Sequence, residues 1–400
     1  MDLNNFVKKY VINRQSSLFS PDIEANIAKL RTEINNKSVL VIGGAGSIGS
    51  SYIKALLKFE PSKLVVVDLN ENGLAELTRD LRSSDKLKVP PIYLTYTLDF
   101  ADPIFEDIYR EHEGFDIVAN FSAHKHVRSE KDKYSVEALL KNNVIKAKRL
   151  LDLLSEIPPK HFFCVSTDKA ANPVNVMGAS KRVMEDLIMA YKHKFKVTTA
   201  RFANVAFSNG SLPASFFDRL MKNQPLVAPK DVRRYFVSME ESGQICMLAC
   251  ILGNNGEVFF PKLEEETMKT FNSICDDFLA EMGFEKHECS SDEEAKTFAA
   301  QHLPGTKYPV VYFESDTTGE KDYEEFVVDG EESDLDRFVS LGVITGSKHR
   351  SKEEVNQFIS NLESLFNNRN FTKSQVVECL QDFLPNFRHE EKGKNLDQKM

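Results

Sequence analysis

The sequence lacks the features that mark membrane-spanning, secreted, disulfide-stapled or nucleic-acid-binding chains. It has no hydrophobic run long enough to cross a bilayer and no N-terminal apolar stretch before a small-residue cleavage site. Its 6 cysteines form no C-x-x-C pair, so we expect no disulfide framework, no metal site and a reducing cytoplasm. We expect Cys246 and Cys250 to be core residues. The formal net charge of −9 offers no positive field, so nucleic acid is not an expected partner.

Short apolar runs of strand length alternate with amphipathic helical stretches between residues 38 and 202. This order predicts an α/β fold, a doubly wound parallel sheet of Rossmann type with helices on both faces. Beyond Phe202 the alternation breaks, which predicts a smaller C-terminal lobe. We expect a helical extension over 1–37, the Rossmann domain over 38–202 with a return segment at about 235–255, the second lobe over 203–234 and 256–345, and a helical C-terminal extension with a tail over 346–400.

A glycine-rich turn follows the first predicted strand, with glycines at 43, 46 and 49 and with Ser47 and Ile48 between them. Glycine permits the tight turn and lets the backbone approach a pyrophosphate. The helix that follows offers free N–H donors at its N-terminus. Because a strand precedes the turn and a helix follows it, the motif predicts a dinucleotide-binding site.

An acidic residue ends the second predicted strand, as this site requires. Asp68 lies about twenty residues beyond the glycines and can accept both ribose hydroxyls. No arginine follows it to neutralise an extra phosphate, so we expect NAD rather than NADP. Asp99 and Phe100, after the third strand, either bracket the adenine ring or serve as a helix cap and a core aromatic.

Hydroxyl, carboxyl and amine groups gather after the fifth predicted strand. Thr167, Asp168 and Lys169 come directly after it, and the next helix carries Met177 and Lys181. Ligands of open parallel sheets bind beyond the carboxyl ends of the strands, so we expect this cluster to face the nicotinamide. The alternative for an adjacent Asp and Lys is a surface ion pair.

The sequence resembles the extended short-chain dehydrogenase/reductases, and within them the UDP-N-acetylglucosamine 4,6-dehydratases of bacterial polysaccharide and flagellar glycan synthesis. The resemblance runs from about Ser38 to Phe326, and the long central motif is its most specific part. It rests on the glycine motif, on Ala123 to Val127 (AHKHV), on Ser166 to Ala170 (STDKA), on Asn172 to Arg182 (NPVNVMGASKR), on Arg201 to Val205 (RFANV), and on Gly319-Glu320-Lys321 before Tyr323-Glu324-Glu325.

The resemblance implies an internal redox cycle with NAD as the cofactor. Carbon 4 of the sugar is oxidised, water leaves across carbons 5 and 6, and the hydride returns to carbon 6. Asp168 would be the acid at the carbon 6 hydroxyl, Lys169 the base at carbon 5, and Thr167 a hydrogen-bonding partner of the oxygen on carbon 4. Lys181 would hold the nicotinamide ribose.

One position departs from the wider superfamily, which carries a Tyr four residues before the helical lysine. This chain has Met177 there, as does the membrane-anchored branch of the dehydratases. A thioether has no proton to exchange, so Met177 cannot be the base. Asp168, Lys181 or a held water is left as the proton acceptor for the first oxidation.

The substrate residues are also implied by the resemblance. Asn204, Ser208 and Ser211 would contact the diphosphate of a UDP-sugar, Arg234 would hold its nucleotide, and Lys125 would touch the sugar or a phosphate. The alternative for each is a solvated loop residue. Three departures indicate a divergent subgroup: Arg128 replaces a Pro, Thr317-Thr318 replaces an Arg-Pro pair, and helical material extends beyond about residue 345.

Together these observations predict a cytoplasmic, NAD-dependent enzyme for UDP-N-acetylhexosamines, namely a 4,6-dehydratase of bacterial glycan or nonulosonic acid synthesis, with inversion at carbon 5 left open. We expect a homodimer or larger homo-oligomer. Two enzymatic alternatives are a second-step oxidoreductase acting on a 5,6-unsaturated 6-deoxy sugar and an epimerase. A third alternative is a silent cofactor-binding scaffold, against which the retained Asp168, Lys169 and Lys181 argue.

Overall fold

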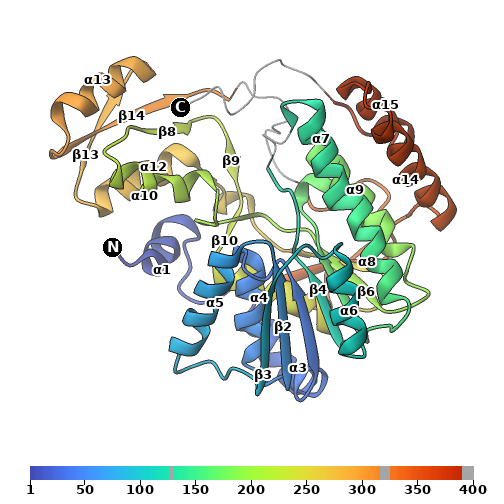
Figure 1. Cartoon of the computed structure of the whole chain (residues 1–400). Coiled ribbons are helices and arrows are strands. Elements are labelled where there is room, and N and C mark those ends of the chain that lie inside the picture. Colours follow the sequence, from blue (N-terminus) through green and yellow to red (C-terminus); the bar gives the residue numbers. More distant parts are fainter. Residues whose placement is uncertain (127–129, 316–324, 390–400) are drawn as a thin grey trace.

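The computed structural model describes residues 1–126, 130–315 and 325–389 (Figure 1). Its large sheet has the strand order β15-β16-β11-β6-β5-β4-β1-β2-β3. All neighbours from β3 to β11 are parallel, while β16 runs antiparallel to β11 and β15 antiparallel to β16. The strands are β1 (Ser38–Ile42), β2 (Lys63–Asp68), β3 (Ile92–Thr97), β4 (Ile117–Asn120), β5 (His161–Val165), β6 (Val197–Ala200), β11 (Glu257–Pro261), β15 (Ser333–Asp334) and β16 (Leu341–Ile344). The predicted doubly wound α/β fold is confirmed.

Helices cover both faces of this sheet because alternate side chains of each strand point to opposite faces. In β1, Val39 and Val41 belong to one hydrophobic core, whereas Leu40 and Ile42 belong to another. The first core is closed by α3 (Ile27–Ile34), α4 (Ser47–Leu57), α5 (Glu71–Ser83) and α11 (Met239–Leu252). The second is closed by α6 (Pro103–Glu111), α7 (Lys133–Leu140), the π-helix Lys141–Lys146, α8 (Ala147–Leu154) and α9 (Val176–Met189).

The N-terminal extension connects the large sheet to the second lobe. It contains α1 (Leu3–Phe6), a π-helical turn (Val7–Val11) and α2 (Ser20–Ala25) before α3. Phe6 is buried in the core of the second lobe, whereas Phe19 is buried against the large sheet. Between them, Arg14 Nε lies 2.7 Å from Glu241 Oε1 of α11. The extension therefore packs on both parts of the molecule.

The second lobe is built on a parallel three-stranded sheet in the order β13-β14-β8, seen at the upper left of Figure 1. Two small pairings, β7 with β10 and β9 with β12, lie in the same part of the sequence. The elements are β7 (Asn204–Val205), α10 (Leu212–Met221), β8 (Leu226–Pro229), β9 (Arg233–Arg234), β10 (Phe236–Val237), the 3₁₀ turn Glu265–Thr267, β12 (Lys269–Thr270), α12 (Phe271–Glu281), β13 (Glu285–Cys289), α13 (Asp292–His302) and β14 (Lys307–Phe313).

The boundary predicted for this lobe was wrong at two strands. We assigned residues 256–345 to it, but β11 and β16 pair with each other in the large sheet. Every residue of both strands is buried, and Val258 and Phe259 contribute to the two cores of that sheet. The chain thus leaves the sheet after β11, builds the second lobe and returns to the sheet edge.

The C-terminal extension forms α14 (Lys352–Asn367) and α15 (Lys373–Phe383), which cover the α9 side of the sheet (Figure 1). Val355, Phe358 and Leu362 join the core that contains α9. Most of the predicted tail, residues 390–400, lies outside the described residues. Within the described part of the chain, every helix is too short or too polar to cross a membrane.

Candidate active site

The glycine-rich turn after β1 has room for backbone only. Gly43 has a φ of +74°, and a Cβ atom on it would lie 2.6 Å from the backbone nitrogen of Ser122, at the end of the neighbouring strand. A Cβ on Gly49 would lie 2.4 Å from the carbonyl oxygen of Gly43. Gly46 is the N-cap of α4 and provides no side-chain cap. The first N–H groups of α4 are therefore available to an anion, as a pyrophosphate site requires.

Asp68 lies beside this turn at the end of β2. Its Oδ2 accepts a hydrogen bond from Ala45 N at 2.9 Å, and its Oδ1 accepts one from Asn70 N at 2.9 Å. Each carboxylate oxygen can accept a second bond, so both can still receive ribose hydroxyls. The turn, the open helix N-terminus and this carboxylate fit NAD.

Asp99 and Phe100 have contacts of their own. Asp99 forms an ion pair with Lys146 and accepts a bond from Ala101 N at 2.9 Å. Asp102, not Asp99, caps α6. Phe100 is buried in the core on the α9 side of the sheet. The role of these two residues at an adenine ring stays a prediction, whereas the core position of Phe100 matches the alternative.

A carboxylate and an amine meet directly after β5. Asp168 begins the 3₁₀ turn Asp168–Ala170 and is only 2% exposed. Its Oδ1 accepts a bond from Thr167 Oγ1 at 2.5 Å, and the Lys169 Nζ lies 3.2 Å from both carboxylate oxygens. A Cβ on Gly178 would lie 2.5 Å from the Lys169 carbonyl oxygen, so glycine lets α9 begin against this turn. The pair is therefore held at the carboxyl edge of the sheet.

Met177 and Lys181 lie one turn apart on α9 and both are buried. The Lys181 Nζ donates to the carbonyl oxygen of Val165, the last residue of β5, at 3.0 Å. Burial lowers the pKa of Lys181. The backbone N–H of Met177 donates to Glu130 Oε1 at 3.1 Å. The structure thus brings Lys181 to the end of β5, the strand that leads into the turn of Asp168.

Asn143 is a residue of this region that sequence reasoning missed. Its Oδ1 accepts from His124 N at 2.9 Å, and its Nδ2 donates to His124 O and to Ser180 Oγ, both at 3.0 Å. Ser180 Oγ in turn donates to Met177 O at 2.7 Å. Asn143 therefore fixes the segment after β4 to α9. The sequence offered only two adjacent amides, Asn142 and Asn143, within an amphipathic helical stretch.

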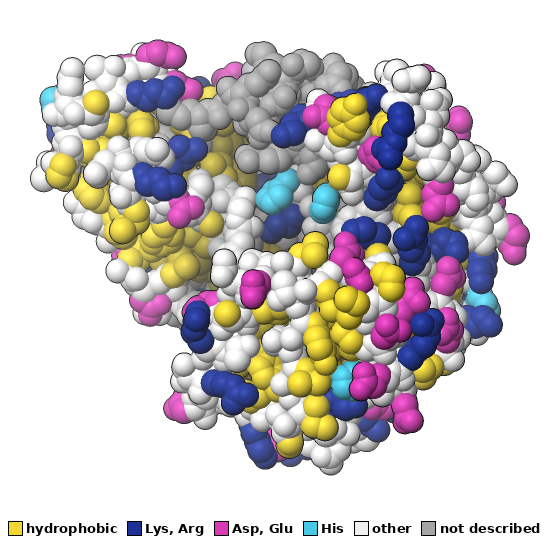
Figure 2. Space-filling view, viewed as in Figure 1, with side chains coloured by type: hydrophobic (Ala, Val, Ile, Leu, Met, Phe, Trp, Pro, Cys, Tyr) yellow, Lys and Arg dark blue, Asp and Glu magenta, His cyan; other side chains and the backbone are white. Residues whose placement is uncertain are grey.

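The loop after β7 connects the cofactor side to the predicted substrate side. Asn209 N donates to Ser47 Oγ at 2.9 Å, and Lys125 Nζ donates to Asn209 O at 3.0 Å. Ser208 is buried in this loop, and Ser211 caps α10. The structure thereby brings Ser47, Lys125 and this loop together. Figure 2 shows basic and histidine side chains in the hollow between the lobes.

Asn204 and Arg234 lie in the two small pairings near this loop. The Asn204 N–H donates to Tyr235 O at 3.2 Å, and the buried Arg234 donates through Nη1 to Arg233 O at 2.9 Å. Their contacts to a substrate stay predictions. Val127, Arg128, Thr317, Thr318 and the predicted motif 319–324 lie outside the described residues.

A buried ion-pair network behind the site also escaped the sequence reading. Arg201, at the end of β6, is fully buried and binds the carboxylates of Glu185 on α9 and Glu331. Ser166 Oγ donates to Glu185 Oε1 at 2.6 Å. The network joins β5, β6, α9 and the chain around residue 331. Arg201 was part of a quoted motif, but nothing in the sequence paired it with Glu185.

Comparison with known proteins finds one matching family model and several similar proteins. The family model described as "Polysaccharide biosynthesis protein" matches residues 39–341. An uncharacterized membrane protein of Methanocaldococcus jannaschii is 32% identical over 77% of this chain and 86% of its own length. The UDP-N-acetylglucosamine 4,6-dehydratase (inverting) of Campylobacter jejuni is 29% identical over 57% and 68%. A UDP-glucose 4-epimerase of Rickettsia bellii is 26% identical over 82% and 96%.

Some relatives are much longer than the part that matches this chain. It spans 43% of a capsular polysaccharide biosynthesis protein of Staphylococcus aureus, to which it is 28% identical over 65% of its own length. Among solved structures, Pen from Bacillus thuringiensis has a TM-score of 0.63 at 21% identity, covering 82% of this chain and 98% of that one. The enzyme WbmF of Bordetella bronchiseptica, solved with NAD⁺, has a TM-score of 0.50 at 18% identity over 63% and 81%. These structural likenesses support the fold.

Proposed function

Because the chain belongs to the polysaccharide biosynthesis protein family of extended short-chain dehydrogenase/reductases, we propose that it is an NAD-dependent enzyme acting on a UDP-N-acetylhexosamine. Within that class we propose a UDP-N-acetylglucosamine 4,6-dehydratase. The observation that carries this choice is the ion pair between the buried Asp168 and the partly exposed Lys169 just after β5, the strand whose last carbonyl accepts from Lys181. The inverting dehydratase of Campylobacter jejuni, at 29% identity, supports it.

The cofactor would be held by the residues of the glycine-rich turn and Asp68. The free N–H groups at the start of α4 would receive the pyrophosphate, and the Asp68 carboxylate would receive the ribose hydroxyls. When bound, NAD supplies the acceptor for a hydride removed from carbon 4 and the donor for its return to carbon 6. Lys181, held at the end of β5, would orient the nicotinamide ribose.

The Asp168–Lys169 pair already contains the proton that dehydration needs. As an ion pair the two groups hold one proton, on Lys169; moving that proton to Asp168 gives a neutral acid and a neutral amine. Lys169 can then take the proton from carbon 5, which is acidic once carbon 4 is a ketone. Asp168 gives its proton to the carbon 6 hydroxyl, which leaves as water. Thr167, bonded to Asp168, would hold the oxygen on carbon 4.

The substrate would lie in the hollow between the lobes. Lys125 and the loop of Ser208 and Ser211 meet at the glycine turn, where a diphosphate would be stabilised by a cation and hydroxyl donors. Arg234 and Asn204 lie in the small pairings beside this loop and would hold the nucleotide end. Asn143 and Glu130, which form hydrogen bonds with residues of α9, would position that helix.

The test is incubation of the purified chain with NAD and UDP-N-acetylglucosamine, followed by mass spectrometry and NMR. A 4,6-dehydratase forms a product lighter by one water, and in heavy water it carries deuterium at carbon 5. An epimerase, which the relative from Rickettsia bellii represents, changes the configuration at carbon 4 without a change in mass. Absence of water loss with every UDP-N-acetylhexosamine offered would contradict the dehydratase proposal.

A further inference from the structure

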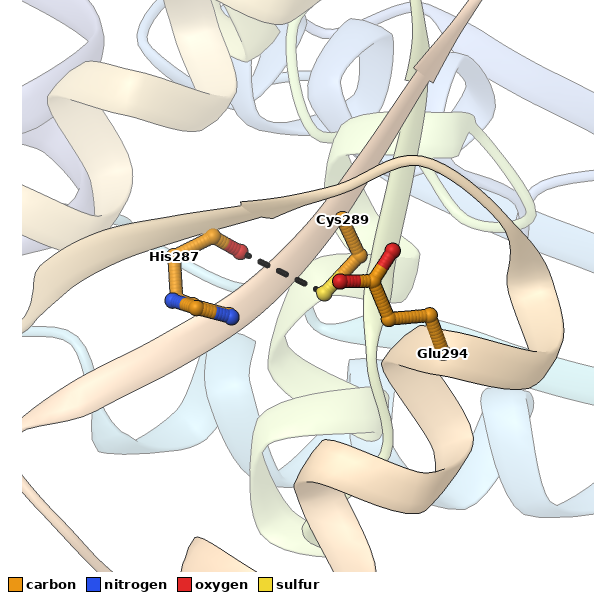
Figure 3. A group of neighbouring side chains, drawn as sticks. All are labelled: His287, Cys289 and Glu294. Atoms are coloured by element: carbon orange, nitrogen blue, oxygen red, sulfur yellow. Dashed lines mark hydrogen bonds between the residues drawn. The ribbon is translucent and has the colours of Figure 1, made fainter.

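A second group of reactive side chains lies in the smaller lobe, on β13 and the start of α13. His287 and Cys289 are two residues apart on β13, so both side chains point to the same face of the strand. Glu294 lies in the first turn of α13. Figure 3 shows the three side chains side by side, and their ligand atoms all lie within 4.8 Å of one another.

We propose that His287, Cys289 and Glu294 bind one divalent transition-metal ion, with Zn²⁺ as the preferred ion. A thiolate, an imidazole nitrogen and a carboxylate oxygen are the donor types that Zn²⁺ takes in proteins. Three protein ligands leave the fourth tetrahedral position for water. Binding replaces the thiol proton of Cys289, which passes to solvent as the sulfur–metal bond forms.

The neighbours of the three ligands hold them in place. The His287 ring stacks on Phe298 of α13 with the ring centroids 3.9 Å apart and the planes 16° apart. Glu294 Oε2 accepts bonds from Ser290 N at 2.7 Å and from Ser290 Oγ at 2.6 Å. Hydrogen bonds of this kind orient metal ligands in known sites. Cys289 is buried, so its sulfur cannot swing into solvent.

The group also has no cation of its own among the described residues. No lysine or arginine there forms an ion pair with Glu294, and no described residue makes a hydrogen bond with the His287 ring. The nearby Lys286 is engaged with Asp276 and Glu288. The Glu294 carboxylate and the His287 imidazole therefore have unused acceptor positions that could bind a metal ion.

Such an ion would fasten α13 to the edge of the three-stranded sheet. Among the described residues, β13 pairs with β14 only, and the small core between α13 and the sheet consists of Val227, Cys289, Ala295 and Val311 with two partly buried phenylalanines. A metal bridge from β13 to α13 would add to the stabilisation that this small core provides. The proposed site is separate from the Asp168–Lys169 pair and does not depend on the proposed reaction.

The experiment is titration of the full-length chain, freed of metal by a chelator, with Co²⁺. We expect one equivalent to bind with the sulfur-to-cobalt charge-transfer band and the intense visible bands of four-coordinate Co²⁺, and Zn²⁺ to displace it. Cys289→Ala should abolish the charge-transfer band. His287→Phe, which keeps the ring stack, and Glu294→Gln, which keeps an acceptor for Ser290, should each weaken binding by about tenfold or more.

Two matched variants serve as controls. Cys379→Ala removes a partly buried thiol on α15, and Glu288→Gln removes a carboxylate from the opposite face of β13. Both should bind Co²⁺ as the unmodified chain does, and Zn²⁺ should raise their melting temperature. The proposal is overturned if the unmodified chain binds no stoichiometric Co²⁺, or if the charge-transfer band survives Cys289→Ala. If Cys289→Ala fails to fold, the other two variants decide. The proposal is then overturned if folded His287→Phe and Glu294→Gln bind Co²⁺ as tightly as the unmodified chain does.

Discussion

Glu130 Oε1 accepts the backbone N–H of Met177 at 3.1 Å, in the first turn of the helix that carries Lys181. The other oxygen of the same carboxylate lies 3.1 Å from His389 Nε2, at the end of the described C-terminal extension. The side chains of Glu130 and His389 are both buried. The extension beyond α15 is therefore linked through one carboxylate to the region of the candidate active site.

Replacing His389 by alanine should destabilise the chain, because it leaves a buried carboxylate oxygen without its partner. We expect the free energy of unfolding to fall by about 1–3 kcal/mol in urea titrations. The exposed His193, replaced by alanine, is the control and should change stability little. Equal stability of the His389→Ala variant and the unmodified chain would show that the contact contributes nothing.

Asp168→Asn should remove the acid proposed for departure of the carbon 6 hydroxyl. The amide keeps the shape of the side chain but cannot hold the proton shared with Lys169, so we expect kcat to fall by about 10²–10⁴-fold. Asp116 is a matched control at the opposite, amino end of the sheet, where its carboxylate accepts from Ser38 N and Ser38 Oγ.

Asp116→Asn should therefore keep the kcat of the unmodified chain. The measurement is the rate of water loss from UDP-N-acetylglucosamine, with the melting temperature of each variant as a check on folding. Comparable kcat values for the Asp168 and Asp116 variants would contradict the role given to Asp168.

Gly43→Ala should weaken NAD binding for two reasons, backbone strain and a steric clash in the turn. Gly283→Ala is the control that separates the strain from the clash. Both glycines have a positive φ, +74° and +81°, so alanine costs about 1–2 kcal/mol of backbone strain at either position. Only Gly43 also faces backbone atoms, whereas nothing lies within 4 Å of a Cβ on Gly283. We expect calorimetry to show NAD affinity at least about tenfold lower for Gly43→Ala, or about 1.4 kcal/mol. Unchanged NAD affinity in Gly43→Ala would mean that the turn does not carry the pyrophosphate.

The parts that the sequence predicts are those with local patterns. The alternation of apolar runs and amphipathic helices, and glycines between a strand and a helix, each follow from neighbouring residues, and the predicted fold is confirmed. The contacts of Asn143, Glu130 and Arg201 join residues far apart in the chain, and no spacing rule predicts them. The return of β16 to the large sheet was missed for the same reason, because its apolar run alone does not say which sheet it joins.

Glu185 and Arg201 should make stability depend on pH in acid. Burial alone would raise the pKa of Glu185, but the charges of Arg201 and Arg182 and the hydrogen bonds from Arg201 and Ser166 together outweigh burial and hold the pKa at about 2. Because this value is below the ordinary 4.5, the folded state binds the proton less readily than the unfolded state. The stabilisation is thus complete above pH 4.5 and is lost as the pH falls from there to about 2.

Glu185→Gln tests this directly. Because it breaks a buried pair and leaves Arg201 with one carboxylate instead of two, we expect a loss of about 3–5 kcal/mol in the free energy of unfolding at neutral pH. The difference from the unmodified chain should shrink below pH 4.5, where the native carboxylate starts to lose its advantage. Glu156→Gln, in an exposed pair with Arg110, should change stability little at any pH. A difference that stays constant down to acid pH would mean that Glu185 is not ionised in the folded chain.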